Sequence, residues 1–99
     1  MKNIQINIPL KDNDGSDNAS VIETVIDAMM SLNGGATRWD AFGYWKDQDG
    51  KLYAEPVAII QSSTTETGQP DRLAKMVLEA TDQLAVFTAD GGKAKIIER

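Results

Sequence analysis

The stretch that decides the fold is residues 34–57, which read GGATRWDAFGYWKDQDGKLYAEPV. It holds both tryptophans, both tyrosines and one of the two phenylalanines of the chain. Two aromatic-rich segments flank a polar turn that contains Asp49 and Gly50, an arrangement typical of a β-hairpin. Large aromatic rings supply much of the burial energy that is available to a small domain. We therefore expect the rest of the chain to be built around this hairpin.

Alternation along the hairpin predicts two different faces. The first strand should carry on one face Trp39, Ala41, Gly43 and Trp45, and on the other Arg38, Asp40, Phe42, Tyr44 and Lys46. Pro56 interrupts the second strand, because proline cannot donate a hydrogen bond to a neighbouring strand. We expect a bulge or bend there, so that residues 57–60 pair with a different part of the chain.

Length and composition limit the classes of protein to consider. A chain of 99 residues predicts a single domain over residues 1–99. The absence of cysteine and histidine removes disulfides, thiolate metal sites and the commonest general base. A net charge of −5 disfavours binding to nucleic acid or to an anionic membrane. No apolar run approaches membrane-spanning length, so we expect a cytoplasmic protein with no membrane partner.

The segment before the hairpin predicts one strand and one helix. Residues 3–10 alternate isoleucine with polar residues, which is typical of a half-buried strand. Apolar residues over 19–33 recur with helical spacing, and Ser20 with Glu23 fits a capping box at the start. Gly34 then provides the left-handed residue that commonly ends a helix.

The segment after the hairpin predicts a loop, a second helix and two short strands. Polar residues over 61–69 indicate the loop, and the helix over 69–84 would carry an exposed pair of Asp71 with Lys75. Residues 85–89 and 93–97 flank a glycine turn as a second hairpin. The order of elements predicts an α+β fold, namely a ferredoxin-like βαββαβ sandwich with both helices on one face of an antiparallel sheet and an extra C-terminal strand.

The hairpin also carries a resemblance. It matches the pattern G-x-W-x-D-x-D-G-x-x-x-x-E-P through Gly43, Trp45, Asp47, Asp49, Gly50, Glu55 and Pro56. This pattern resembles a group of small uncharacterised bacterial and phage-associated proteins, and it is similar to a hairpin of the DUF3574 family. The resemblance covers the middle of the chain, whereas the ends share only the general plan. It implies a ferredoxin-like fold and a phage or mobile-element origin, and it implies no catalytic residue.

Two aspartate-rich segments have a composition related to calcium loops. In the first, Asp12, Asn13 and Asp14 precede Gly15, with Glu23 further on, but the glycine is at the fourth position rather than the sixth. The second, residues 47–50, departs from the loop pattern in a similar way. Aspartate and asparagine favour turns by bonding to their own backbone, so we interpret both segments as turns. We expect no metal and no cofactor.

RNA binding is an alternative that the charge opposes. Phe42, Gly43 and Tyr44 match the centre of an RNA-recognition strand motif, and the fold plan is the same. The motif requires a basic residue and a glycine before them, where this chain has Asp40 and Ala41. Stacking aromatics normally bind single strands together with a positive groove. We therefore expect no nucleic-acid partner.

An enzyme or ligand-binding protein of the dimeric α+β-barrel type is a second alternative. Its pocket would lie between sheet and helices, and the groups near the hairpin that could move protons or orient a substrate are Arg38, Asp40, Tyr44, Tyr53 and Glu55. A buried carboxylate with a raised pKa could act as a base. Among these residues Arg38, Asp40 and Glu55 are the pocket candidates, although surface salt bridges would explain the charges equally well.

The interpretation that the sequence favours is a small, acidic, non-catalytic protein-binding module. Helices can cover only one face of the hairpin, so the other face should expose two large rings. The contact residues would be Trp39, Phe42, Tyr44, Trp45 and Tyr53. The partner would be a second copy of the chain, as a homodimer, or a host protein. A phage or mobile-element protein of this kind would bind and inhibit a host defence protein.

Overall fold

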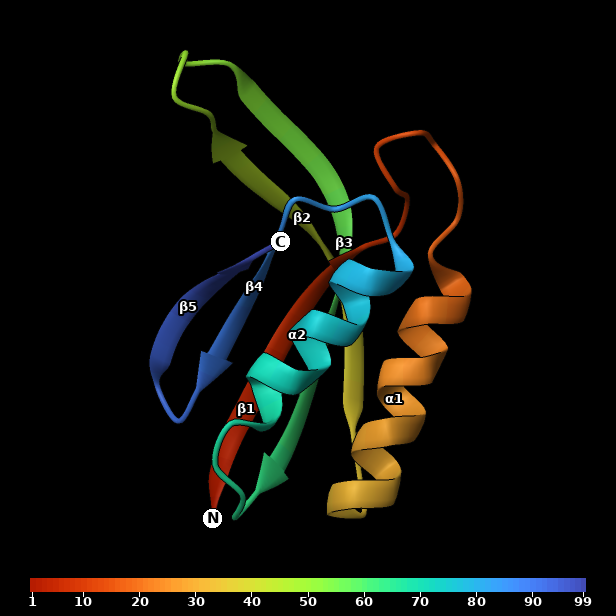
Figure 1. Ribbon diagram of the computed structural model, residues 1–99, viewed down its shortest axis with the longest axis vertical. Helices are drawn as coiled ribbons and strands as arrows, with labels where there is room; N and C mark the ends of the chain where they lie inside the picture. The colour runs from red at the N-terminus through yellow and green to blue at the C-terminus, as the bar shows by residue number, and fades with distance from the viewer.

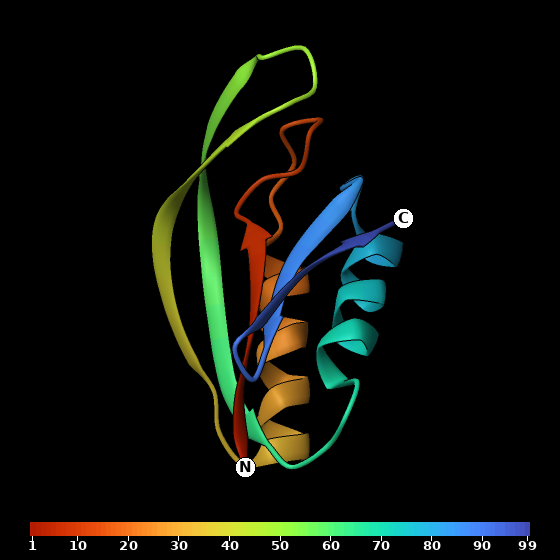
Figure 2. The same cartoon turned by 90° about the vertical axis from the view of Figure 1, so that its left-hand side faces the viewer.

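The computed structural model describes residues 1–99 and contains five strands and two helices. In chain order they are β1 (Lys2–Pro9), α1 (Ala19–Asn33), β2 (Thr37–Lys46), β3 (Leu52–Thr64), α2 (Gln69–Ala80), β4 (Ala85–Asp90) and β5 (Lys93–Glu98). All neighbouring strands are antiparallel, in the order β2-β3-β1-β4-β5. Figures 1 and 2 show both helices on the same side of the sheet. The predicted α+β, ferredoxin-like arrangement with an extra terminal strand is confirmed.

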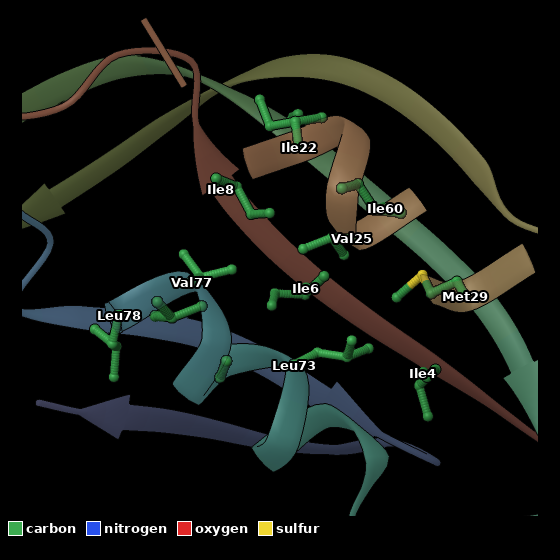
Figure 3. Packing of buried hydrophobic residues seen from close by; sticks show 13 residues of the cluster. Ile4, Ile6, Ile8, Ile22, Val25, Met29, Ile60, Leu73, Val77 and Leu78 are labelled. Carbon is green, nitrogen blue, oxygen red and sulfur yellow. The ribbon is translucent and has the colours of Figure 1, made fainter. Parts of the chain in front are cut away.

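The core lies between β1 and the two helices. Period-two alternation points Ile4, Ile6 and Ile8 of β1 towards the helices, and each is at most 1% exposed. Figure 3 shows these side chains meeting apolar residues from both helices, among them Val25 and Val77. This packing leaves the other face of the sheet without a cover.

Helix α1 ends as predicted but starts differently. Gly34 adopts a left-handed conformation, φ 86°, and its N–H donates to the carbonyl of Met30. The predicted capping box at Ser20 is wrong, because the helix begins at Ala19 and the capping position is Asn18. The Ala19 N–H donates to the Asp17 carboxylate, which starts the helix before Ser20. The Asn18 amide instead donates to the carbonyl of Pro9 and so ties the helix start to β1.

The predicted bulge or bend at Pro56 is wrong, since β3 runs unbroken from Leu52 to Thr64. The expected pairing of residues 57–60 with another part of the chain is confirmed, because they pair with β1. The carbonyl of Pro56 accepts a hydrogen bond from the N–H of Leu10. A strand residue directs its nitrogen and its carbonyl to the same side, so the Pro56 nitrogen faces the β1 side. The β1 ladder ends at the pair Pro9 and Val57, and Pro56 therefore removes no hydrogen bond from the pairing with β2.

Smaller differences concern the second half of the chain. Residues 61–64 belong to β3 rather than to a loop, because β1 pairs with them up to Lys2 opposite Thr64. Helix α2 stops at Ala80, four residues earlier than expected, where the backbone of Thr81 is extended. Asp71 pairs with Lys95 of β5 at 3.1 Å rather than with Lys75. Neither helix has the length and apolar character needed to cross a membrane.

Candidate functional site

The β2–β3 hairpin extends beyond the helices, as Figures 1 and 2 show. Cross-strand pairs in an antiparallel sheet share a face, so the register divides the hairpin side chains. The open face, away from the helices, carries Trp39, Ala41, Gly43 and Trp45 of β2 opposite Ile59, Val57, Glu55 and Tyr53 of β3. The helix-side face carries Arg38, Asp40, Phe42 and Tyr44 opposite Ile60, Ala58, Pro56 and Ala54. The predicted alternation of β2 is confirmed.

The structure therefore separates the five aromatic residues that were predicted to form one contact surface. Trp39, Trp45 and Tyr53 lie on the open face, whereas Phe42 and Tyr44 lie on the opposite one. Phe42 and Tyr44 are nevertheless 61% and 77% exposed, because this part of the hairpin lies beyond the helices. The expectation that only one face would expose its rings is wrong.

The pocket candidates are separated in the same way. Arg38 and Asp40 are on the helix-side face and form an ion pair with each other at 3.0 Å, bridged by two hydrogen bonds. This pair satisfies both charges without a ligand. Glu55 lies alone on the open face, half-buried, and takes part in none of the four ion pairs of the molecule.

Around Glu55 the hairpin combines a carboxylate, two aromatic rings and a glycine on the opposite strand. Trp45 and Tyr53 stack with ring centroids 4.2 Å apart and an interplanar angle of 9°. Gly43 is the residue opposite Glu55 and adds no side chain to this face, and the Val57 side chain lies beside it. Aromatic faces and a carboxylate both attract organic cations, the rings through their quadrupole. The Glu55 carboxylate and the outer face of the Trp45 ring suit a ligand that carries a positive charge next to a planar group, whereas the Tyr53 ring already has Lys51 over it.

The turn of the hairpin holds Tyr53 in position. The Tyr53 hydroxyl donates to the Asp47 carboxylate at 3.2 Å, and the Lys51 ammonium lies 5.0 Å from the centre of its ring. The other carboxylate oxygen of Asp47 accepts the backbone N–H groups of Asp49 and Lys51, which fixes the turn. The sequence prediction of an aspartate-based turn is confirmed here. Asp47 in this turn also orients the Tyr53 ring of the candidate site.

A polar pocket lies elsewhere on the molecule, at the junction of α1 with β2. It has a volume of about 470 Å³ and is lined by the backbone of residues 34–36 and by polar side chains. These side chains are Asn3, Asn33, Thr37, Gln61, Ser62 and Ser63, with Met1 at the margin. The sequence interpretation missed this cavity, because its lining comes from three separate segments.

Three carboxylates lie within 4.8 Å of one another, those of Asp12, Asp14 and Asp82. Asp82 accepts the backbone N–H groups of Asn13 and Asp14, and Asp12 accepts the N–H of Asp82 and the amide of Gln83. Burial by itself would raise the pKa of Asp12, but these hydrogen bonds outweigh it and lower the pKa. Hydrogen bonds from Ser16 lower the pKa of Asp14. The cluster joins the β1–α1 loop to the α2–β4 loop, and Glu23 is not part of it.

No family model and no curated protein matches the chain. Two solved structures are similar to it in fold. One is a phage SAM lyase in the apo state, with 20% identity and a TM-score of 0.68. The other is a phage SAM lyase in complex with S-methyl-5'-thioadenosine, with 19% identity and a TM-score of 0.70. In both cases the match covers 98% of this chain and 88% of the other.

These comparisons contradict the prediction of a non-catalytic protein-binding module that inhibits a host protein. Both solved structures with this fold are of a phage SAM lyase, which is an enzyme that acts on a small molecule. The prediction was wrong because it took the scarcity of histidine and cysteine as evidence against catalysis. The alternative, a small-molecule enzyme or ligand-binding protein, agrees better with the comparisons. The resemblance to the DUF3574 family stays an expectation.

Proposed function

We propose that this chain is an enzyme that binds S-adenosylmethionine (SAM) and cleaves it to release S-methyl-5'-thioadenosine. The observation that carries the proposal is the half-buried Glu55 carboxylate beside the stacked rings of Trp45 and Tyr53. SAM combines a sulfonium cation with a planar adenine, which are the two groups that a carboxylate and aromatic faces attract. The fold neighbours, which are SAM lyases, support the choice of this cation over others.

Glu55 would hold the sulfonium. Two opposite unit charges about 4 Å apart attract by about 4 kcal/mol near a protein surface. The site is open in the single chain, so water would reduce this figure. The neutral product lacks this attraction, so it would bind to the site more weakly than the substrate does.

The chemistry needs few groups from the protein. When the bond between sulfur and the four-carbon chain breaks, its electron pair stays on sulfur and the sulfonium becomes a neutral thioether. Without water, the four-carbon fragment either closes onto its own carboxylate or loses a proton from the adjacent carbon. The first route needs no base, and in the second Glu55 is the carboxylate that would accept the proton. Histidine and cysteine are required in neither route.

The test is to incubate the purified protein with SAM and to measure the thioether nucleoside and the four-carbon product by chromatography. We expect release of the nucleoside from the wild type and at least a tenfold loss of kcat/KM in Glu55→Gln. Asp40→Asn is the matched control, because it removes a carboxylate from the opposite face of the same hairpin. An inactive wild type, or a Glu55→Gln variant as active as the wild type, would refute the proposal.

We also propose that the chain forms a homodimer through the open face of the sheet. The register aligns four apolar side chains across this face, with Asn7 of β1 between them. They are Trp39, Ile59, Phe87 and Ile96. Trp39 and Ile96 are 42% and 57% exposed. Exposed apolar side chains in a row of this kind favour association.

We further propose a phage origin for the chain, which would agree with the fold neighbours.

A further inference from the structure

The cavity at the α1–β2 junction has a rigid wall. The Asn33 amide donates to Gln69 at 2.7 Å and to the Ser62 hydroxyl at 3.0 Å, and the Gln69 amide donates back to Asn33 at 3.0 Å. Ser62 in turn donates to the carbonyl of Gly35 at 2.6 Å. Gln69 is fully buried, so this network fixes the end of α1 against β3 and α2. The backbone at Gly35 is therefore held in one position.

Several hydrogen-bonding groups of the same cavity are left unused within the chain. The N–H groups of Gly35 and Ala36 have no backbone acceptor, and the Gln61 amide and Thr37 hydroxyl make no side-chain hydrogen bond. The Asn3 amide uses only its oxygen, which accepts the Ser63 hydroxyl at 2.8 Å. The cavity thus offers donors and acceptors on a pre-formed surface, to which a polar ligand can bind through hydrogen bonds.

The lining has no acidic or basic side chain. No charged side chain of the lining would pair with a charged ligand, so a neutral polar ligand fits best. Side-chain amides bind the edge of adenine in a bidentate way, and Gln61 and Asn3 provide two such groups at adjacent strands. A volume of about 470 Å³ is within the range of small-molecule sites.

This cavity is a different place from the Glu55 site. Gln61 and Glu55 are on the same strand, six residues apart, which corresponds to about 20 Å along β3. A single nucleoside does not reach from one to the other. The two places also differ in charge, because one has a carboxylate and the other has no charged side chain.

We infer that the cavity at the α1–β2 junction is a second site, which binds a neutral purine nucleoside through Gln61, Asn3 and the backbone of Gly35 and Ala36. The choice of a nucleoside among neutral polar ligands rests on the proposed function, since the product of that reaction is a neutral adenine nucleoside. A site of this kind lets product accumulate on the enzyme without occupying the Glu55 site.

The experiment measures binding of adenosine to the full chain by calorimetry and by NMR, without any substrate for turnover. We expect chemical-shift changes at Gly35 and Ala36, and at least a tenfold rise in Kd for adenosine in Gln61→Leu. Gln5→Leu is the matched control, because Gln5 faces Gln61 across the β1–β3 pair but does not line the cavity. Circular dichroism checks that both variants stay folded.

The outcomes separate this inference from the proposed function. Adenosine binding that depends on Gln61 but not on Glu55 supports a second site, even if the protein does not cleave SAM. Adenosine binding that is lost in Glu55→Gln and kept in Gln61→Leu overturns it, as does no binding at millimolar adenosine. Equal binding of ribose and adenosine would overturn the assignment of the base edge to Gln61.

Discussion

At the scale of single residues, Gly43 keeps the position opposite Glu55 free of a side chain. Its backbone is an ordinary strand conformation, so a side chain causes no backbone strain, but an added Cβ would lie 3.4 Å from Val57 on the open face. We expect Gly43→Val to fill the space next to the carboxylate and to reduce SAM binding about tenfold, and Gly43→Ala to have a smaller effect. Calorimetric titration with SAM measures both. A Gly43→Val variant that binds like the wild type would show that the ligand does not lie here.

Asp12 is the residue whose charge contributes most clearly to stability. Its pKa is lowered in the folded state, because hydrogen bonds from Gln83, Asp82 and Asn18 favour the carboxylate over burial. A lowered pKa stabilises the fold above the pKa of the unfolded state, about 4, and this contribution is lost as pH falls through the folded pKa. We expect Asp12→Asn to lower the free energy of unfolding by about 2 kcal/mol at pH 7, typical of lost hydrogen bonds to a charged group.

The measurement is urea unfolding of the wild type and Asp12→Asn between pH 7 and pH 2.5. The difference between them should shrink below about pH 4, because the wild-type carboxylate then becomes protonated as well. Asp49→Asn serves as the control, because it changes an exposed carboxylate in a turn. Asp17→Asn is less suitable, since the Asp17 carboxylate accepts a hydrogen bond from the first residue of α1. A difference that stays constant over this pH range would contradict the role given to the charge of Asp12.

At the scale of elements, much of the architecture could be predicted because the signals are local. The isoleucine alternation of β1, the apolar spacing of α1 and the glycine at its end are all readable from neighbouring residues. Pro56 was misjudged because its effect depends on where β1 ends, a fact about a different strand. The predicted length of α2 is too great, because Asp12 accepts hydrogen bonds from Asp82 and Gln83 in the loop that follows α2, and the helix ends at Ala80.

The candidate site could be predicted only in part for the same reason. The sequence placed the relevant groups on one hairpin and separated the two faces of β2 correctly. It could not show that Arg38 and Asp40 neutralise each other or that Glu55 is left alone, because both depend on side-chain positions. The polar cavity draws on Asn3, Asn33 and Gln61, which are far apart in the sequence, and no local pattern joins them.

At the scale of the whole molecule, the net charge of −5 opposes binding to phosphate backbones. We expect no detectable binding to single-stranded RNA or DNA at physiological salt, in spite of the exposed rings of Phe42 and Tyr44. Fluorescence anisotropy with labelled oligonucleotides measures this. A micromolar affinity that weakens as salt rises would contradict the prediction and favour an RNA-recognition role.

The open face of the sheet gives the last prediction, which concerns self-association. Trp39 lies on this face at the edge strand β2 and does not belong to the Trp45–Tyr53 stack, so changing it tests association without removing the ligand site. We expect the wild type to have a mass of two 10.8-kDa chains by light scattering at tens of micromolar, and Trp39→Glu to have the mass of one. A charge within a covered apolar surface costs several kcal/mol when it has no partner. Phe42→Glu is the matched control, because it adds the same charge at an exposed ring position on the other face of β2 and should leave the dimer intact.

Loss of association in Phe42→Glu with an intact assembly in Trp39→Glu would move the interface to the helix-side face of the hairpin. A wild-type mass of one chain would contradict the dimer, and a mass of three or more chains would contradict its two-chain stoichiometry.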